Sequence, residues 1–147
     1  MILRCAALAV LSVLPALAQS TSSDAEQLHL RQVLSEAGSS PVEFIRALET
    51  HLARFPESDR KKEMERSIVK AAIEAKDDRR ILLYGERLLG EGEDDLQVLE
   101  RVTRILLAKD DKDRAERAWK YAGRFEQGLK GLEKDAPRSL RAQAQFR

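Results

Sequence analysis

Apolar residues recur every three or four positions along most of this chain, and short polar or glycine-containing breaks separate the stretches that show this spacing. Such spacing places apolar side chains on one face of a helix, and no stretch alternates apolar and polar residues as a half-buried strand does. We therefore expect an all-α fold of about six helices. Their apolar positions run from Leu28 to Ala37, Val42 to Leu52, Met64 to Ala75, Ile81 to Leu89, Leu96 to Leu106 and Ala115 to Leu132.

Several breaks carry helix-start signals. Ser40 precedes Pro41, and Glu43 follows three residues after the serine, which is the pattern of a capped helix start with proline in the first turn. The sequence also indicates a first helix from Asp24 and a fifth from about Asp94 to Ala108. Pro137, after the last apolar stretch, ends the sixth helix.

The tetrapeptide AKDD occurs at residues 75–78 and again at 108–111, 33 residues later. Each copy follows an apolar helix and precedes an arginine-bearing one. Aspartates at this place can accept hydrogen bonds from the exposed N–H groups of the next helix. We interpret AKDD as the recurring turn of a helical hairpin, so that the six helices form three antiparallel hairpins stacked as a short solenoid.

Two aromatic and glycine pairs resemble the first helix of the tetratricopeptide repeat. The residues that carry the resemblance are Tyr84-Gly85 with Leu88 or Leu89, and Trp119 with Ala122-Gly123. The two aromatic and glycine sites stand 37 or 38 residues apart, whereas AKDD recurs after 33 residues. No proline ends a repeat where the family has one. Across residues 41–132, the resemblance implies a right-handed solenoid that binds a protein or peptide on its concave face without catalysis.

The N-terminus has the features of a secretory signal. Arg4 precedes an apolar stretch that is too short to span a bilayer, and Ala16 and Ala18 supply the small residues that a signal peptidase recognises. We expect cleavage after Ala18, hence a signal at 1–18, a helical repeat domain at 19–133 and a basic tail or short helix at 134–147. The protein is expected to be periplasmic or extracellular, with no stable membrane anchor after cleavage.

Charge and composition exclude several function classes. The chain has 26 Lys and Arg against 25 Asp and Glu, so it has no general attraction to nucleic acid, and we expect no nucleic-acid partner. Its one cysteine, Cys5, lies in the signal, which leaves no thiol nucleophile or thiolate metal site. His29 and His51 lie on different predicted helices, where surface or interface histidines are favoured over a metal site. We expect no catalytic residues, cofactor or metal, and hence no enzyme.

Aromatic and arginine side chains are the best candidates for partner binding. Trp119 and Phe125 are expected in the core because they continue an apolar stripe. We select Tyr84, Arg87, Tyr121 and Arg124 as partner-binding residues. The arginines of the last three helices either form a solvated face with glutamates or receive an acidic peptide: Arg79, Arg80, Arg87, Arg101, Arg104, Arg114, Arg117 and Arg124.

The sequence thus indicates an exported, non-enzymatic interaction module with an unidentified protein or peptide partner. A second hypothesis rests on a similarity to the helical regions that precede thioredoxin-like domains in some bacterial envelope proteins. In that case the chain would be an accessory region of an envelope enzyme such as a thiol-disulfide reductase, whose catalytic domain is not in this chain.

Overall fold

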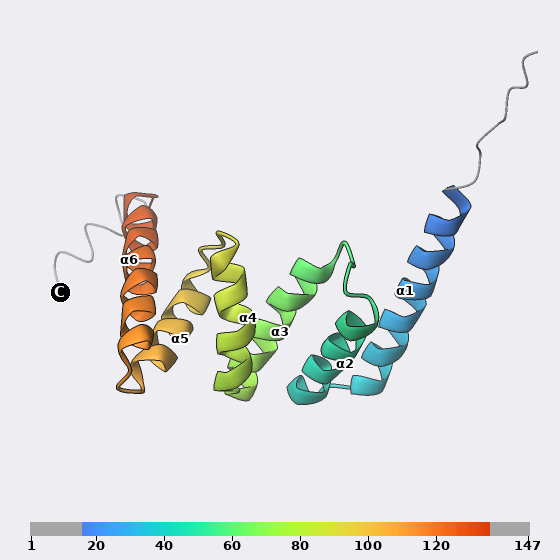
Figure 1. The fold of residues 1–147 in the computed structure, drawn as a ribbon, viewed down its shortest axis with the longest axis horizontal. Coiled ribbons are helices and arrows are strands. Elements are labelled where there is room, and N and C mark those ends of the chain that lie inside the picture. Colours follow the sequence, from blue (N-terminus) through green and yellow to red (C-terminus); the bar gives the residue numbers. More distant parts are fainter. Residues whose placement is uncertain (1–15, 136–147) are drawn as a thin grey trace, which may run out of the picture.

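A computed structural model describes residues 16–135 and contains six helices in that range. They are α1 (Ala16–Ala37), α2 (Pro41–Arg54), α3 (Lys61–Ala75), α4 (Asp78–Gly90), α5 (Leu96–Leu107) and α6 (Lys112–Asp135). The helices follow one another in chain order along the long axis, each packed against the next (Figure 1). No strand occurs between residues 16 and 135, so the expected all-α fold of consecutively stacked helices is confirmed.

The predicted helix starts are confirmed at three turns. The Ser40 hydroxyl accepts a hydrogen bond from the Glu43 N–H at 3.4 Å, although the Glu43 carboxylate binds Arg46 instead of bonding back. Asp77 caps α4, and in the second AKDD copy Asp111 caps α6 by accepting from the backbone N–H of Arg114 at 2.8 Å. The two tetrapeptides therefore have the same role as hairpin turns.

Two helix boundaries differ from expectation. The first helix starts at Ala16 instead of Asp24, because no proline or glycine interrupts the chain between them, and it therefore runs across the expected cleavage site. The fifth begins at Leu96 because Asp95, expected inside the helix, caps it by accepting from two backbone N–H groups. The rest of the predicted signal, residues 1–15, and residues 136–147 of the predicted tail lie outside the described residues.

The core runs between the stacked helices, and most predicted apolar positions lie in it. The fully buried apolar side chains are Ile45, Ile68, Val69, Ala72, Leu99, Val102 and Leu106. Gly85 marks a close approach of α4 to α5, since a Cβ there would lie 2.8 Å from the Cγ2 of Val102 on α5. Glycine thus allows α4 and α5 to cross closely.

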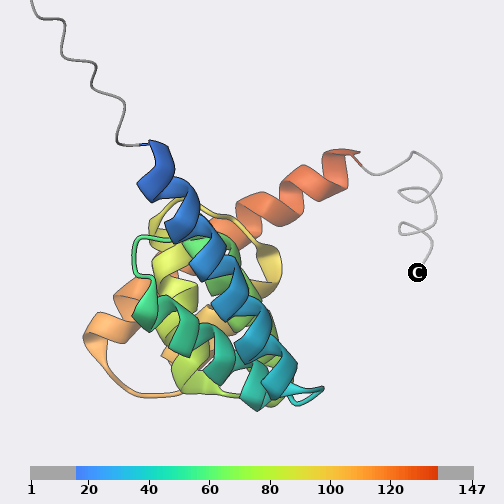
Figure 2. The same cartoon turned by 90° about the vertical axis from the view of Figure 1, so that its right-hand side faces the viewer.

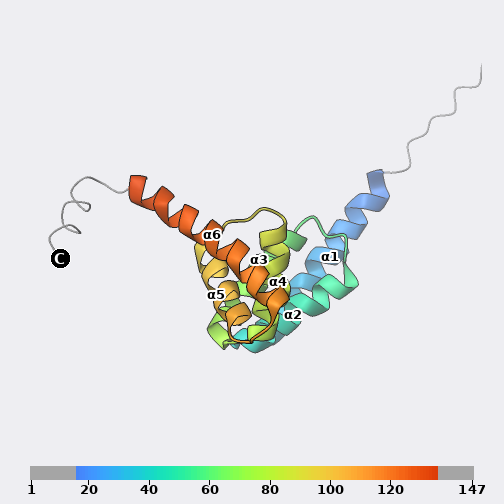
Figure 3. The same ribbon diagram turned by 60° about the vertical axis from the view of Figure 1, so that its left-hand side comes forward.

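The core prediction for Trp119 is wrong, since its side chain is 83% exposed. Phe125 packs partly buried against the core, but Leu129 and Leu132 are largely exposed although they continue the apolar stripe. The reason is that α6 is twice as long as α5, with 24 residues against 12, and projects beyond it (Figures 2 and 3). Within residues 16–135, no further helix packs on the outer side of α6.

The structure also explains why the sequence showed two repeat lengths. The even helices correspond at 37 residues: α2 begins at Pro41 and α4 at Asp78, and Tyr84 on α4 corresponds to Tyr121 on α6. The odd helices α3 and α5 and their AKDD turns correspond at 33. Two features account for the difference between the two repeat lengths. The α5–α6 turn is longer than the α3–α4 turn, and more helical residues precede Tyr121 in α6 than precede Tyr84 in α4.

Candidate functional site

The four predicted partner-binding residues form two equivalent pairs on α4 and α6. The guanidinium carbon of Arg87 lies 5.4 Å from the ring centre of Tyr84, and that of Arg124 lies 5.9 Å from the ring centre of Tyr121. Both tyrosine rings are buried. Each tyrosine thus stacks under an arginine one helical turn later, as cation–π pairs do.

Both tyrosines reach towards a carboxylate on the preceding even helix. Glu49 on α2 accepts hydrogen bonds from the Arg80 guanidinium at 2.8 and 2.9 Å and from the Tyr84 hydroxyl at 3.2 Å. The bond from Arg80 holds the pKa of Glu49 below its usual value, and burial raises the pKa of Tyr84. No sequence motif marks Glu49 as part of this contact.

The same arrangement recurs 37 residues later. Glu86 on α4 accepts from Arg117 of α6 at 2.7 Å. Burial raises the pKa of Tyr121, and the charge of Glu86 and a hydrogen bond to it raise it further. We call these contacts the carboxylate ladder. Its two rungs are Glu49 with Arg80 and Tyr84, and Glu86 with Arg117 and Tyr121. This ladder ties each even helix to the next.

Arg87 and Arg124 also bind across helices. Arg87 donates to Glu65, a carboxylate of α3 that is almost fully buried. Arg124 donates to the Asp94 side chain at 2.7 Å and to the backbone carbonyls of Leu89 and Glu93 at 2.8 and 2.7 Å. The structure therefore brings each tyrosine together with its arginine but places the two pairs on different helices. Their role in partner binding stays a prediction.

The two histidines, expected on separate helices, are in contact in the fold. The Nδ1 atoms of His29 on α1 and His51 on α2 lie 3.0 Å apart, and His51 is fully buried. Its Nε2 lies 3.6 Å from a carboxylate oxygen of Glu26, which accepts a hydrogen bond from Ser58. The residues come from sequence positions 26–58, and no spacing signal links them because two helices and a turn must fold together first.

This histidine cluster is built for a hydrogen bond rather than for a metal ion. The ring centres are 5.2 Å apart and the facing nitrogens 3.0 Å, so one Nδ1 must donate and the other accept, with no gap between them. Within the described chain, no group of three or more metal-ligating side chains has a suitable geometry. Burial, then the charge of Arg54, lowers the pKa of His29. The contact between the two rings ties α1 to α2.

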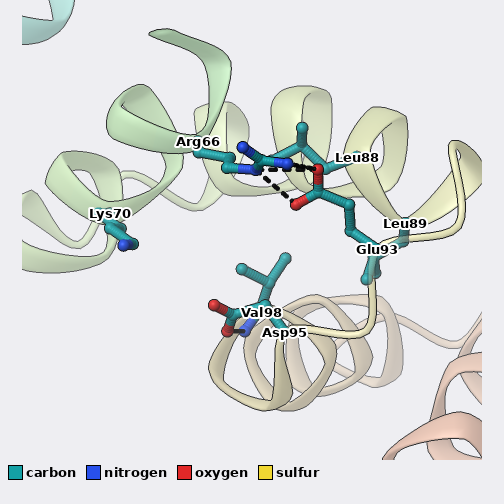
Figure 4. A pocket seen from close by; sticks show the side chains of 7 residues that line it. All are labelled: Arg66, Lys70, Leu88, Leu89, Glu93, Asp95 and Val98. Atoms are coloured by element: carbon teal, nitrogen blue, oxygen red, sulfur yellow. Dashed lines mark hydrogen bonds and ion pairs between the residues drawn. The ribbon is translucent and has the colours of Figure 1, made fainter. Parts of the chain in front are cut away.

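A small hollow of about 130 Å³ lies between α3, α4 and α5 (Figure 4). Leu88, Leu89 and Val98 form its apolar part, and Arg66 reaches across to Glu93 with an Nε–Oε2 distance of 2.8 Å. This bond lowers the pKa of Glu93. The hollow is too small for a peptide, and Arg66 and Glu93 are already paired across it, so it is poorly suited to bind a partner.

A larger groove, of about 670 Å³, opens between α4, α5 and the start of α6 and is called the α4–α6 groove. Its apolar surface consists of Leu82, half-exposed Leu83, Ile105 and Ala108. Arg79 of α4, Lys109 of the turn and Arg114 of α6 supply cations around it. An open apolar surface with polar groups at its edge is a common form of peptide-binding site.

The ion pairs divide the eight arginines of the last three helices into two groups. Six of them pair with acidic side chains: Arg80, Arg87, Arg101, Arg104, Arg117 and Arg124. Arg79 and Arg114 have no ion-pair partner among residues 16–135. The interpretation as an interleaved charged surface therefore fits six arginines, and the two others are those that line the α4–α6 groove.

Comparisons of this chain with protein-family models, with curated proteins and with solved structures found no match. The resemblance to the tetratricopeptide repeat therefore stays a hypothesis that rests on the residues given above. None of the helices between Ala16 and Asp135 combines the length and apolar character that a bilayer crossing requires.

Proposed function

We propose that this protein is an exported, non-enzymatic protein–protein interaction module, organised like a tetratricopeptide solenoid, that binds a protein segment in the α4–α6 groove. The observation that carries the proposal is the groove itself: about 670 Å³ of open space over Leu82, Leu83 and Ile105. Leu83 is 50% exposed in the middle of a helix. An exposed leucine next to other apolar side chains gains most by being covered by a partner.

The position of the polar clusters supports a binding role over a chemical one. The carboxylate ladder ties α2 to α4 and α4 to α6, and the histidine cluster ties α1 to α2. Such groups stabilise the stack of helices, which keeps the groove in shape before a partner arrives. Preformed surfaces lose less conformational entropy on binding than flexible ones.

Photo-crosslinking in the producing cells tests the proposal. A benzophenone amino acid at Leu83 is expected to crosslink a discrete protein, because that side chain points into the groove. The matched control carries the same group at Leu107, which is 62% exposed and lies outside the groove. Export is checked on the same material by intact mass, with loss of residues 1–18 as the expected result.

The two crosslinking positions give opposite outcomes if the proposal is right. A partner captured at Leu83 and not at Leu107 supports it. Identical products at both positions, or no product at Leu83, contradict it. The identity of the captured protein also separates the two hypotheses, because a thioredoxin-like reductase would favour the accessory-region alternative.

A further inference from the structure

The α4–α6 groove has a net positive character once the internal ion pairs are counted. Its five charged residues are Arg79, Lys109 and Arg114 with Asp78 and Glu86. Glu86 is already bound to Arg117, and its charge also acts on Tyr121. Asp78 lies in the first turn of α4, where the positive end of the helix dipole favours a carboxylate. The three cations thus remain to meet a ligand.

We infer that the α4–α6 groove binds an acidic peptide segment that places a large apolar side chain on Leu83 and carboxylates against Arg79 and Arg114. This inference rests on the proposed function and adds the chemistry of the partner. Carboxylates complement the unpaired guanidinium groups, which can hold them with two parallel hydrogen bonds each. Charge complementarity of this kind favours acidic partners and disfavours basic ones.

The same surface is poorly suited to nucleic acid. Proteins that bind single strands stack bases on aromatic side chains, and no aromatic residue lines the groove among the described residues. Its apolar part is made of leucine, isoleucine and alanine side chains, which suit the aliphatic side chain of a peptide.

Fluorescence anisotropy with the full chain and two labelled peptides provides the test. The first peptide is composed of glutamate and leucine, and the second replaces each glutamate by glutamine while keeping the leucines. The acidic peptide is expected to bind more tightly, and its affinity is expected to fall as salt is added, because exposed ion pairs are screened. Phosphatidylglycerol vesicles and single-stranded DNA serve as competitors of other chemistry.

A double variant, R79Q/R114Q, is expected to weaken binding of the acidic peptide roughly two- to thirty-fold, the effect of losing two exposed ion pairs. R104Q is the matched control, because Arg104 is exposed, pairs with Glu100 and lies outside the groove. It should leave the affinity unchanged. Circular dichroism checks that the variants keep their helices.

Equal affinity for the two peptides, no binding of the acidic peptide, or equal losses in R79Q/R114Q and R104Q would each overturn the inference. So would displacement of the peptide by vesicles or DNA through the same two arginines. Because the crosslinking experiment at Leu83 does not depend on charge, a partner captured there without a preference for acidic peptides leaves the proposed function standing and removes only this inference.

Discussion

Replacing Gly85 by alanine tests how closely α4 approaches α5. The added Cβ would lie 2.8 Å from Val102 Cγ2 and 3.2 Å from Val98 Cγ1, and Val102 is fully buried. Neither valine has a flexible end that could move away, so α5 must shift or a valine must leave its preferred rotamer. Overpacking of this kind costs about 1–3 kcal/mol.

Alanine also favours the helix over glycine by about 1 kcal/mol, which offsets part of this cost. Gly123 on α6 separates the two effects, because a Cβ there would meet no neighbouring side chain within 4 Å. We therefore expect G123A to stabilise the protein by up to about 1 kcal/mol. G85A should be unchanged or destabilised by up to about 2 kcal/mol.

Urea unfolding followed by circular dichroism measures both variants, with equal slopes as the condition for comparing their free energies of unfolding. The predicted difference between them is about 1–3 kcal/mol. Adding V102A to G85A should remove most of the clash, so the two substitutions are expected to be non-additive. If G85A stabilises the protein as much as G123A does, the close crossing of α4 and α5 is refuted.

Three further predictions concern the polar contacts. E49Q removes a charged acceptor of Arg80 and is expected to cost about 1 kcal/mol at neutral pH. Because the pKa of Glu49 is lowered in the folded protein, this stability is present above pH 4.5, and the difference from wild type should vanish as acid protonates Glu49. The pKa of His29 is also lowered, so the melting temperature of the wild type should fall as the pH drops below 6.5, and that of H29N should fall less. An equal fall in the wild type and in H29N would be contrary evidence. D111A should cost about 1 kcal/mol and D110A nearly nothing in urea unfolding, since only Asp111 caps α6; equal costs would count against this assignment.

The helices and their caps were predictable because their causes are local. Ser40 and the aspartates of AKDD sit next to the N–H groups that they bind, and the apolar spacing reports the buried face of each helix. The repeat was predictable only in part. The AKDD spacing of 33 describes the odd helices, whereas the contacts between even helices follow the 37-residue spacing of Tyr84 and Tyr121.

Contacts between distant residues were not predictable in the same way. Trp119 continues an apolar stripe, but burial also needs a second element, and none covers that side of α6 within residues 16–135. His29 and His51 meet only after α1 and α2 have paired. Arg79 and Arg114 resemble the other arginines in the sequence, and only the ion pairs of the folded chain distinguish them.

The carboxylate ladder has a direction that bears on how such an array can grow. In both rungs the acid belongs to the earlier even helix, and the arginine and tyrosine belong to the later one. Gly123 occupies the position on α6 that Glu49 holds on α2 and Glu86 on α4. The array can therefore be extended at this end by design. The substitution G123E, followed by a copied helical unit that carries the arginine and the tyrosine, would add a rung without changes to the existing ones.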